Sequence, residues 1–333
     1  MGEPLENKTV LVTGADGFIG SHLCELLLAA GANVRAYVFY NSWNQVGWLA
    51  DVSDETRNGL QIISGDIRDG QRVSEAVHGC DYVFHLSSLI AIPYSYHAPR
   101  SYVDTNVTGA LNVLQACRES DSLVRMIHVS TSEVYGSAQT VPISESHPLV
   151  GQSPYSASKI GADKLAESYY LSFGLPVVTA RPFNTFGPRQ TARAVIPTII
   201  SQLLSGVDEL VLGALTPTRD FNYVTDTANG MIELALCKEA EGQVVNIGSG
   251  IEWSIEQTAE LLMEITDRKV PIICDEDRLR PEKSEVNRLL ADNRLIHSLS
   301  GWETKVDFKT GLANTCEWIG QNLHYFDTKQ YSI

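Results

Sequence analysis

The sequence lacks the marks of a secreted, membrane-spanning or metal-binding protein. Its six cysteines stand singly and form no Cys-x-x-Cys pair, so we expect buried, reduced thiols and neither a disulfide framework nor a metal site. The amino-terminal residues include acidic side chains and lead directly into a strand-like stretch, and no apolar run is long enough to span a bilayer. A signal peptide and a transmembrane helix are therefore not expected, and the sequence predicts a cytoplasmic protein.

Positive charge is also scarce. The chain has 25 lysines and arginines against 40 aspartates and glutamates, which gives a net charge of -15. Because nucleic acids and anionic lipids bind basic surfaces, we expect neither as a partner. Nine of the sixteen arginines nevertheless lie between Arg181 and Arg294. Guanidinium groups gathered in one region suit an anionic ligand, although solvated surface charge is the alternative for most of them.

Short β-rich runs alternate with amphipathic helical stretches over the first half of the chain. The expected strands are 9–13, 33–39, 61–64, 82–86, 125–130 and 176–180, and the expected helices are 17–30, 101–119, 156–173 and 194–204. This alternation predicts an α/β protein with a Rossmann-type, doubly wound parallel sheet.

After Pro188 the alternation loosens, which predicts a second, smaller α/β domain at the carboxy terminus. We expect a dinucleotide-binding domain over residues 1–188, with residues 225–248 returning to its sheet. The smaller, substrate-binding domain then comprises residues 189–224 and 249–333.

A glycine-rich turn follows the first expected strand at once. Glycines let the backbone approach a pyrophosphate, and the helix that follows offers free N–H groups and the positive end of its dipole. An ordinary glycine turn is the alternative, but the strand before it and the helix after it are the context that a dinucleotide site requires. The expected cofactor-binding residues of the turn are Gly14, Gly17, Phe18, Ile19 and Gly20.

Two short segments supply groups that can move protons. Thr131, Ser132 and Glu133 follow an apolar run, and Tyr155 and Lys159 lie four residues apart, hence on one face of a helix. Together they offer hydroxyls, a carboxylate, a phenol and an ammonium group, and the ammonium is expected to lower the pKa of the phenol. The alternative is a surface pair of tyrosine and lysine.

Glu133 discriminates between reactions. It lies at the carboxyl end of a parallel strand, where such sheets bind ligands, and residues 131 and 133 point to the same side if the extended conformation persists. A simple dehydrogenase or a 4-epimerase needs no second base, so Glu133 suggests removal of a carbon-bound proton or electrostatic support of another step at carbon 5. A solvated acid or a helix-capping residue is the alternative.

The spacing GxxGxxG and the Tyr-x-x-x-Lys pair resemble the extended short-chain dehydrogenase/reductase family. The resemblance implies that Tyr155 is the base on the substrate hydroxyl, that Lys159 holds the nicotinamide ribose and that Thr131 supports the substrate oxygen. It also implies that Asp66 and Ile67 contact the adenine and that Leu86 and Ser88 lie beside the cofactor. The pair Ser87-Ser88 departs from the Ala-Ala that is frequent there.

The cofactor is expected to be NAD(P). The second strand ends at Tyr40, Asn41 and Ser42 without the acidic residue that normally accepts a hydrogen bond from the ribose 2'-hydroxyl. Asn41 and Ser42 can donate to a 2'-phosphate, although no arginine stands beside them. The sequence therefore slightly favours NADP over NAD.

The segment from Thr131 to Gly136 resembles the active-site segment of nucleotide-sugar 4,6-dehydratases. Ser132 departs from the Asp of the dTDP-glucose members and matches the Thr-Ser-Glu of GDP-mannose 4,6-dehydratases, a triplet that also occurs in UDP-glucuronate decarboxylases. Residues 90–96, 192–197 and 280–286 are most similar to the GDP-N-acetylglucosamine 4,6-dehydratases of the legionaminic acid pathway.

The resemblance implies a lyase that converts a nucleotide-linked hexose, GDP- or UDP-N-acetylglucosamine, into its 4-keto-6-deoxy derivative. Its diphosphate would be bound by Asn184, Arg193, Arg219 and Arg280. A UDP-glucuronate decarboxylase, then a 4-epimerase, are the rivals, and a catalytically silent nucleotide sensor is a third. The family also implies a homodimer through the helices 101–119 and 156–173.

Overall fold

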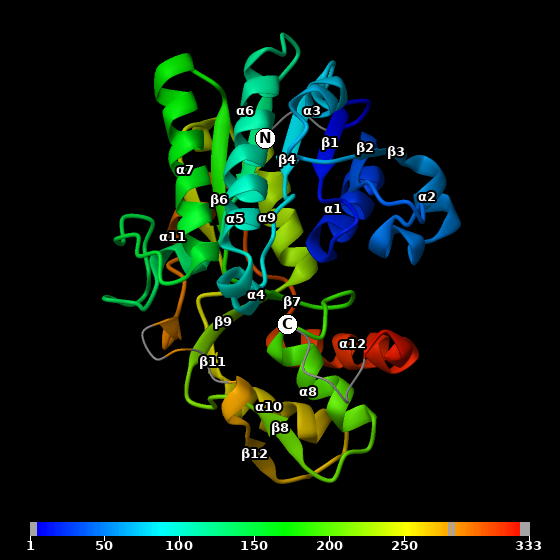
Figure 1. Cartoon of the computed structure of the whole chain (residues 1–333), viewed down its shortest axis with the longest axis vertical. Coiled ribbons are helices and arrows are strands. Elements are labelled where there is room, and N and C mark those ends of the chain that lie inside the picture. Colours follow the sequence, from blue (N-terminus) through cyan, green and yellow to red (C-terminus); the bar gives the residue numbers. More distant parts are fainter. Residues whose placement is uncertain (1–4, 279–280, 282–283, 327–333) are drawn as a thin grey trace.

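A computed structural model describes residues 5–278, 281 and 284–326 of the protein (Figure 1). Arg280, one of the expected substrate-binding residues, lies outside the described residues. A seven-stranded parallel sheet forms the centre of the larger domain. Its strands, from one edge to the other, are β10 (Val244–Ile247), β6 (Val177–Pro182), β5 (Arg125–Val129), β4 (Tyr82–His85), β1 (Thr9–Thr13), β2 (Asn33–Phe39) and β3 (Gln61–Gly65).

The strand order places a ligand site at a defined position. Successive strands run outward from β1 through β2 to β3, and the chain then returns to the other side of β1 for β4. At such a reversal the connections diverge, and open α/β sheets bind ligands beside the carboxyl ends of the strands there. The fold class expected from the alternation of strands and helices is confirmed.

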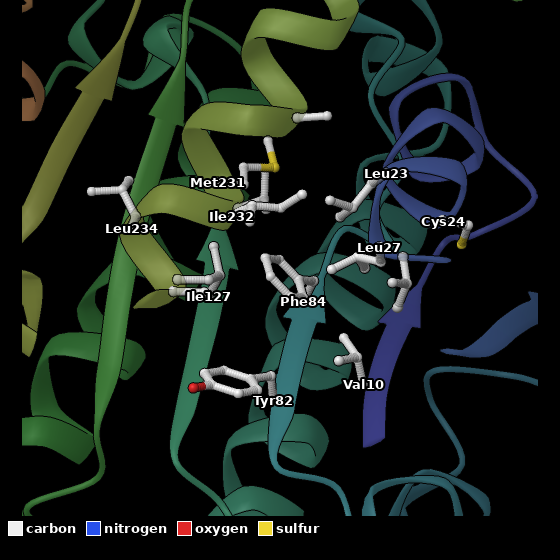
Figure 2. Packing of buried hydrophobic residues seen from close by; sticks show 14 of the residues in the cluster. Val10, Leu23, Cys24, Leu27, Tyr82, Phe84, Ile127, Met231, Ile232 and Leu234 are labelled. Atoms are coloured by element: carbon white, nitrogen blue, oxygen red, sulfur yellow. The ribbon is translucent and has the colours of Figure 1, made fainter. Parts of the chain in front are cut away.

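Helices cover both faces of the sheet, so its strands are buried and rich in apolar residues. One face carries α1 (Phe18–Ala29), α9 (Val224–Leu236) and α11 (Arg294–Ser300). Figure 2 shows Leu27 of α1 and Met231 of α9 close to Phe84 and Ile127 of the sheet. Each such side chain stabilises the fold by about 1.5 to 3 kcal/mol through burial.

The other face carries α3 (Gly70–Val77), α6 (Gly109–Arg118) and α7 (Pro154–Phe173). The helix expected over 101–119 is interrupted. It consists of α5 (Pro99–Tyr102), a π-helical stretch η2 (Val103–Thr108) and α6. Three short helices, η1 (Gly47–Ala50), α2 (Asp54–Gly59) and α4 (Ile92–His97), lie in connections that follow strands of the sheet.

A smaller α/β lobe lies below the sheet in Figure 1. The chain leaves the main sheet after β6 to build this lobe and returns for α9 and β10. The lobe contains strands β7 (Asn184–Phe186), β8 (Leu210–Leu212), β9 (Thr218–Tyr223), β11 (Glu252–Ser254), β12 (Ile272–Cys274) and β13 (Arg288–Leu289), and helices α8 (Val195–Leu204), α10 (Ile255–Ile265) and α12 (Phe308–Gln321). Single-turn helices lie at η4 (Lys238–Ala240), η5 (Glu276–Arg278) and η7 (Leu323–Tyr325). The residue boundaries expected for the two domains stay predictions.

The burial of the cysteines and the character of the helices can be compared with the expectations from composition. Five cysteines are buried, but Cys274 is exposed on β12. The expectation of six buried thiols is wrong at this position because β12 pairs only with β8 and forms a two-stranded sheet. None of the helices in the described part of the chain combines the length and the apolar character that crossing a membrane requires.

Candidate active site

The glycine-rich turn forms a cradle that side chains would fill. Gly14 has a φ of +71°, a conformation that favours glycine, and a Cβ at Gly20 would lie 2.1 Å from the Gly14 carbonyl oxygen. Gly17 precedes the first residue of α1, Phe18, so the free N–H groups of the helix open toward the turn. Ile19 packs partly against the sheet core. This backbone geometry fits the pyrophosphate of a dinucleotide.

The segment after β4 lies against this cradle. A Cβ on Gly14 would lie 2.9 Å from the backbone nitrogen of Ser87. The Thr13 hydroxyl oxygen accepts hydrogen bonds from the backbone N–H groups of Leu86 and Ser87, each at 3.2 Å. Leu86 and Ser88, both half-buried, therefore lie at the carboxyl edge of the sheet beside Gly14.

Asp66 and Ile67 follow β3 at the same edge of the sheet. Ile67 is buried and packs close to Gly109 of α6. The Asp66 carboxylate receives hydrogen bonds from the Arg68 guanidinium group, which lowers the pKa of Asp66 below its usual value. Asp66 is thus held as an ionised acceptor at the edge where an adenine is expected.

The loop after β2 gives no support to the expected preference for NADP. The Asn41 amide donates to the carbonyl oxygens of Phe39 and Gln45, at 3.3 and 2.8 Å. Its two N–H hydrogens therefore hold the loop together instead of facing a ligand. Tyr40 and Ser42 are exposed.

Thr131 and Glu133 are brought together by a helix cap. The extended strand β5 ends at Val129, and residues 132–135 form the 3-10 helix η3 (Ser132–Tyr135). The Thr131 hydroxyl oxygen accepts a hydrogen bond from the Glu133 backbone N–H at 3.2 Å. The expectation that strand alternation aligns residues 131 and 133 is therefore wrong, because the extended conformation does not persist. Ser132 is buried in η3.

Tyr155 lies in the first turn of α7. Pro154 and a capping box between Ser153 and Ser156 fix the start of this helix. The Tyr155 side chain is buried, and its phenol is hydrogen-bonded to the Thr131 hydroxyl. Burial raises the pKa of Tyr155, the Thr131 hydrogen bond lowers it in part, and the nearby negative charge of Glu133 raises it further. The carboxylate of Glu133 and the phenol of Tyr155 thus belong to one site.

Lys159 lies one helical turn after Tyr155 and is buried as well. Its ammonium group donates to the Val129 carbonyl oxygen at 2.7 Å, and burial lowers the pKa of Lys159 to about 8. The expectation that Lys159 lowers the pKa of Tyr155 is wrong here. Burial and Glu133 raise the pKa of the phenol, and the ammonium group is held at the end of β5.

A buried polar network lies under these groups, and sequence reasoning did not anticipate it. The Asp163 carboxylate accepts hydrogen bonds from the Ser130 hydroxyl at 2.8 Å and from the Arg181 guanidinium group at 2.9 Å, and it contacts the His128 ring at 3.2 Å. Burial raises the pKa of Asp163, but these hydrogen bonds and the Arg181 charge hold it below its usual value. Asp163 follows Lys159 by four residues on α7, so helical periodicity was an available signal.

Asn106 is a second residue that sequence reasoning missed. It is buried in the π-helical stretch, where its amide donates to the Leu89 carbonyl oxygen at 3.0 Å and to the Ser158 hydroxyl at 2.9 Å. Its side-chain oxygen accepts from the Leu89 backbone N–H at 2.8 Å. Asn106 therefore joins the segment after β4 to the helix that carries Tyr155. A π-helical turn is often found at functional sites.

The expected substrate residues lie on the smaller lobe and the strand that leads to it. The Asn184 side-chain oxygen, at the start of β7, is buried without a hydrogen-bond partner among the described residues. Arg193 is exposed, and its charge acts on the phenol of Tyr102, whose ring contacts that of Tyr155. Arg219 on β9 is buried and pairs with Glu285 at 3.3 Å.

Comparisons with known proteins agree with this geometry. A family model described as GDP-mannose 4,6 dehydratase matches residues 11–315. A dTDP-glucose 4,6-dehydratase from Actinoplanes sp. is 32% identical over 327 residues, which cover 95% of this chain and 99% of that protein.

Two solved structures resemble the whole fold. The dTDP-glucose 4,6-dehydratase DesIV from Streptomyces venezuelae, a double mutant with NAD bound, has a TM-score of 0.84 and 30% identity, covering 95% of this chain and 98% of that one. A mutant UDP-glucuronic acid 4-epimerase from Bacillus cereus, also with NAD, has a TM-score of 0.86 and 28% identity, covering 94% and 99%. Because the family match spans most of its length, the chain belongs to the GDP-mannose 4,6-dehydratase family, nucleotide-sugar enzymes of the short-chain dehydrogenase/reductase type.

Proposed function

We propose that the protein is a 4,6-dehydratase that removes water from GDP- or UDP-N-acetylglucosamine. The observation that carries this proposal is the shared site of Glu133 and Tyr155. Glu133 is close enough to raise the pKa of the phenol, and its backbone N–H is bonded to the Thr131 hydroxyl that also bonds Tyr155. An epimerase needs only the phenol, whereas water elimination also needs a base for a carbon-bound proton.

The proposed mechanism assigns a proton to each group. A nicotinamide dinucleotide, with its pyrophosphate held by the glycine cradle, would take the hydride from carbon 4 and give it back at carbon 6. Tyr155 removes the proton of the 4-hydroxyl group, and Thr131 holds the same oxygen. The 4-ketone makes the hydrogen on carbon 5 acidic, and Glu133 takes it. The protonated Glu133 then returns this proton to the 6-hydroxyl group, which leaves as water. When carbon 6 receives the hydride, carbon 5 takes up a proton from solvent, which completes the 4-keto-6-deoxy sugar.

Ser132 and a bound water are the other candidates for protonating the leaving group, and one variant separates Ser132 from the other two. If Glu133 or a water is the acid, Ser132→Ala keeps most of its turnover. If Ser132 is the acid, the same variant loses elimination while exchange of the carbon 5 hydrogen continues.

The test of the proposal is incubation of the purified enzyme with each nucleotide sugar, followed by mass spectrometry. We expect a product lighter by one water molecule from at least one of the two. In deuterated water the product should carry deuterium at carbon 5. Glu133→Gln should lose both signals, and Glu167→Gln, an exposed residue of α7, should keep them.

Other products would identify one of the rival enzymes instead. Carbon dioxide released from UDP-glucuronate would identify a decarboxylase, and a product of unchanged mass with inverted carbon 4 would identify an epimerase. Asn184, Arg193, Arg219 and Arg280 are assigned to the diphosphate, and the cofactor is NAD(P).

A further inference from the structure

The corner of the cofactor site at the end of β2 contains one carboxylate that does not come from β2. It belongs to Asp16, inside the glycine-rich turn. Its Oδ2 atom accepts a hydrogen bond from the Phe39 backbone N–H at 3.1 Å, and Phe39 is the last residue of β2. In Rossmann-type folds the acidic residue that binds the adenosine ribose stands at this end of the second strand.

Asp16 is held firmly in this position. Its carbonyl oxygen accepts a hydrogen bond from the Trp48 backbone N–H at 3.0 Å. Gly47 has a φ of +55°, and a Cβ there would lie 2.3 Å from the same carbonyl oxygen. The Trp48 ring in turn packs edge-on against Trp318 and Tyr325, with ring centroids 5.4 and 5.2 Å apart. Helix η1 is therefore pressed onto the turn, which leaves the Asp16 backbone little freedom.

The Asp16 carboxylate retains capacity to accept from a ligand. Besides its own backbone N–H, Phe39 is the only hydrogen-bond donor to this side chain within the described residues. A carboxylate offers about four acceptor positions on its two oxygens. Asp16 is half-buried, so part of the residue stays accessible to a ligand.

No cation among the described residues forms an ion pair with the Asp16 carboxylate. Arg68, which follows β3, is paired with Asp66, and burial raises the pKa of Asp16 with no cation among its causes. A ribose 2'-hydroxyl can donate to such a carboxylate. A 2'-phosphate carries about -1.5 to -2 charges near neutral pH and would be repelled.

We propose that Asp16 replaces the missing acidic residue of β2, binds the adenosine ribose hydroxyls and makes the protein selective for NAD. The inference rests on the dinucleotide site of the proposed function but not on its dehydration step. It reverses the preference for NADP that the sequence of the β2 loop suggested.

The test is calorimetric titration of the nucleotide-free protein with NAD and with NADP. The wild type should bind NAD at least about tenfold more tightly, the order expected for a like charge beside a phosphate in a partly screened site. Asp16→Asn can still accept from Phe39 but has no charge, so NADP should bind it about tenfold more tightly than the wild type. Asp54→Asn removes an equal charge from the exposed surface of α2 and should leave the ratio unchanged.

Thermal melting without nucleotide shows whether each variant is folded, and Asp16→Ser replaces Asp16→Asn if the latter melts early. The inference is overturned if the wild type binds NADP as tightly as NAD, or if both folded variants retain the wild-type ratio. These titrations need no turnover. Failure of the dehydratase assay with normal selectivity for NAD would therefore refute the proposed function alone.

Discussion

Tyr155 combines a buried phenol with a hydroxyl partner and a nearby carboxylate. We expect Tyr155→Phe to lower kcat by about 10² to 10⁴-fold, because a positioned general base contributes about this much. Binding of the cofactor should be little affected, since the ring and its packing against Tyr102 are kept. Steady-state kinetics together with nucleotide titration checks both statements.

Tyr169→Phe is the matched control for this variant. It removes a phenol from the same helix, where the Tyr169 hydroxyl donates to the Gln115 side chain at 3.0 Å, away from the reacting groups. Its kcat should stay within about threefold of the wild type, because one hydrogen bond contributes only about 1 kcal/mol to stability. An equal loss of kcat in the two variants would contradict the assigned role of Tyr155.

Lys159 makes the free energy of unfolding depend on pH in the alkaline range. Its pKa is about 8 in the folded protein and near 10.5 when exposed, so the unfolded chain binds the extra proton between these values. Stability from this group therefore rises with pH from about 8 to about 10.5, by at most about 1.4 kcal/mol per pH unit. Denaturant unfolding of the nucleotide-free proteins checks this. The free energy of unfolding of the wild type should rise relative to that of Lys159→Met as the pH increases over this range. A difference independent of pH would contradict the lowered pKa.

At the scale of elements, the glycine turn depends on close backbone packing. Gly20→Ala places a methyl group 2.1 Å from the Gly14 carbonyl oxygen, so the turn must open. We expect a loss of about 1 to 3 kcal/mol in stability and a cofactor affinity weaker by more than about tenfold. Melting temperature and nucleotide titration are the measurements.

Gly320→Ala in α12 provides the comparison for this change. The nearest atom to its added Cβ is the end of Leu204, at 3.6 Å. Gly320 lies in the last turn of α12, where alanine is favoured over glycine by less than the roughly 1 kcal/mol of a helix interior. This variant should be as stable as the wild type or more so. A Gly20→Ala protein with normal affinity would show that the cradle tolerates a side chain.

Some parts of the site could be predicted from the sequence, and others could not. The turn, Tyr155 and Lys159 follow from spacings within one turn or one helix, which local rules describe well. The placement of Glu133 does not, because the strand stops at Val129 and a cap takes over. Asp163 and its partners come from β5, β6 and α7, so their meeting depends on strand pairing. Strands such as β13, with two residues, are too short to leave a pattern.

At the scale of the whole molecule, we expect a homodimer formed by the long helices. Exposed apolar side chains lie on both of them, with Val103 50%, Leu111 38% and Leu171 73% exposed. Leu111→Glu should shift the protein toward monomers because it places a charge in an apolar contact. Light scattering after gel filtration measures the mass.

Leu204→Glu on α8 serves as the reference for this prediction, because Leu204 is similarly exposed, at 37%, but belongs to the smaller lobe. It should leave the mass of the assembly unchanged. A monomeric wild type, or equal dissociation by both variants, would contradict an interface at α6 and α7.

The overall fold was easier to predict than the side-chain contacts between its two lobes. Alternation of strands and helices gave the layered architecture, since parallel strands with crossover helices have few arrangements. The edge-on contact of Trp48 with Trp318 joins residues from the two lobes, and no periodicity in the sequence predicts it. Side chains that meet across lobes are fixed by the completed fold.

The late arrival of β10 has a consequence for synthesis on the ribosome. Until residues 244–247 emerge, β6 remains an unpaired edge beside a core of apolar strands, and such edges template aggregation. The edge of β6 therefore stays unpaired while the intervening residues of the smaller lobe are translated. Chaperone demand should be highest in that interval and should fall once the last strand docks.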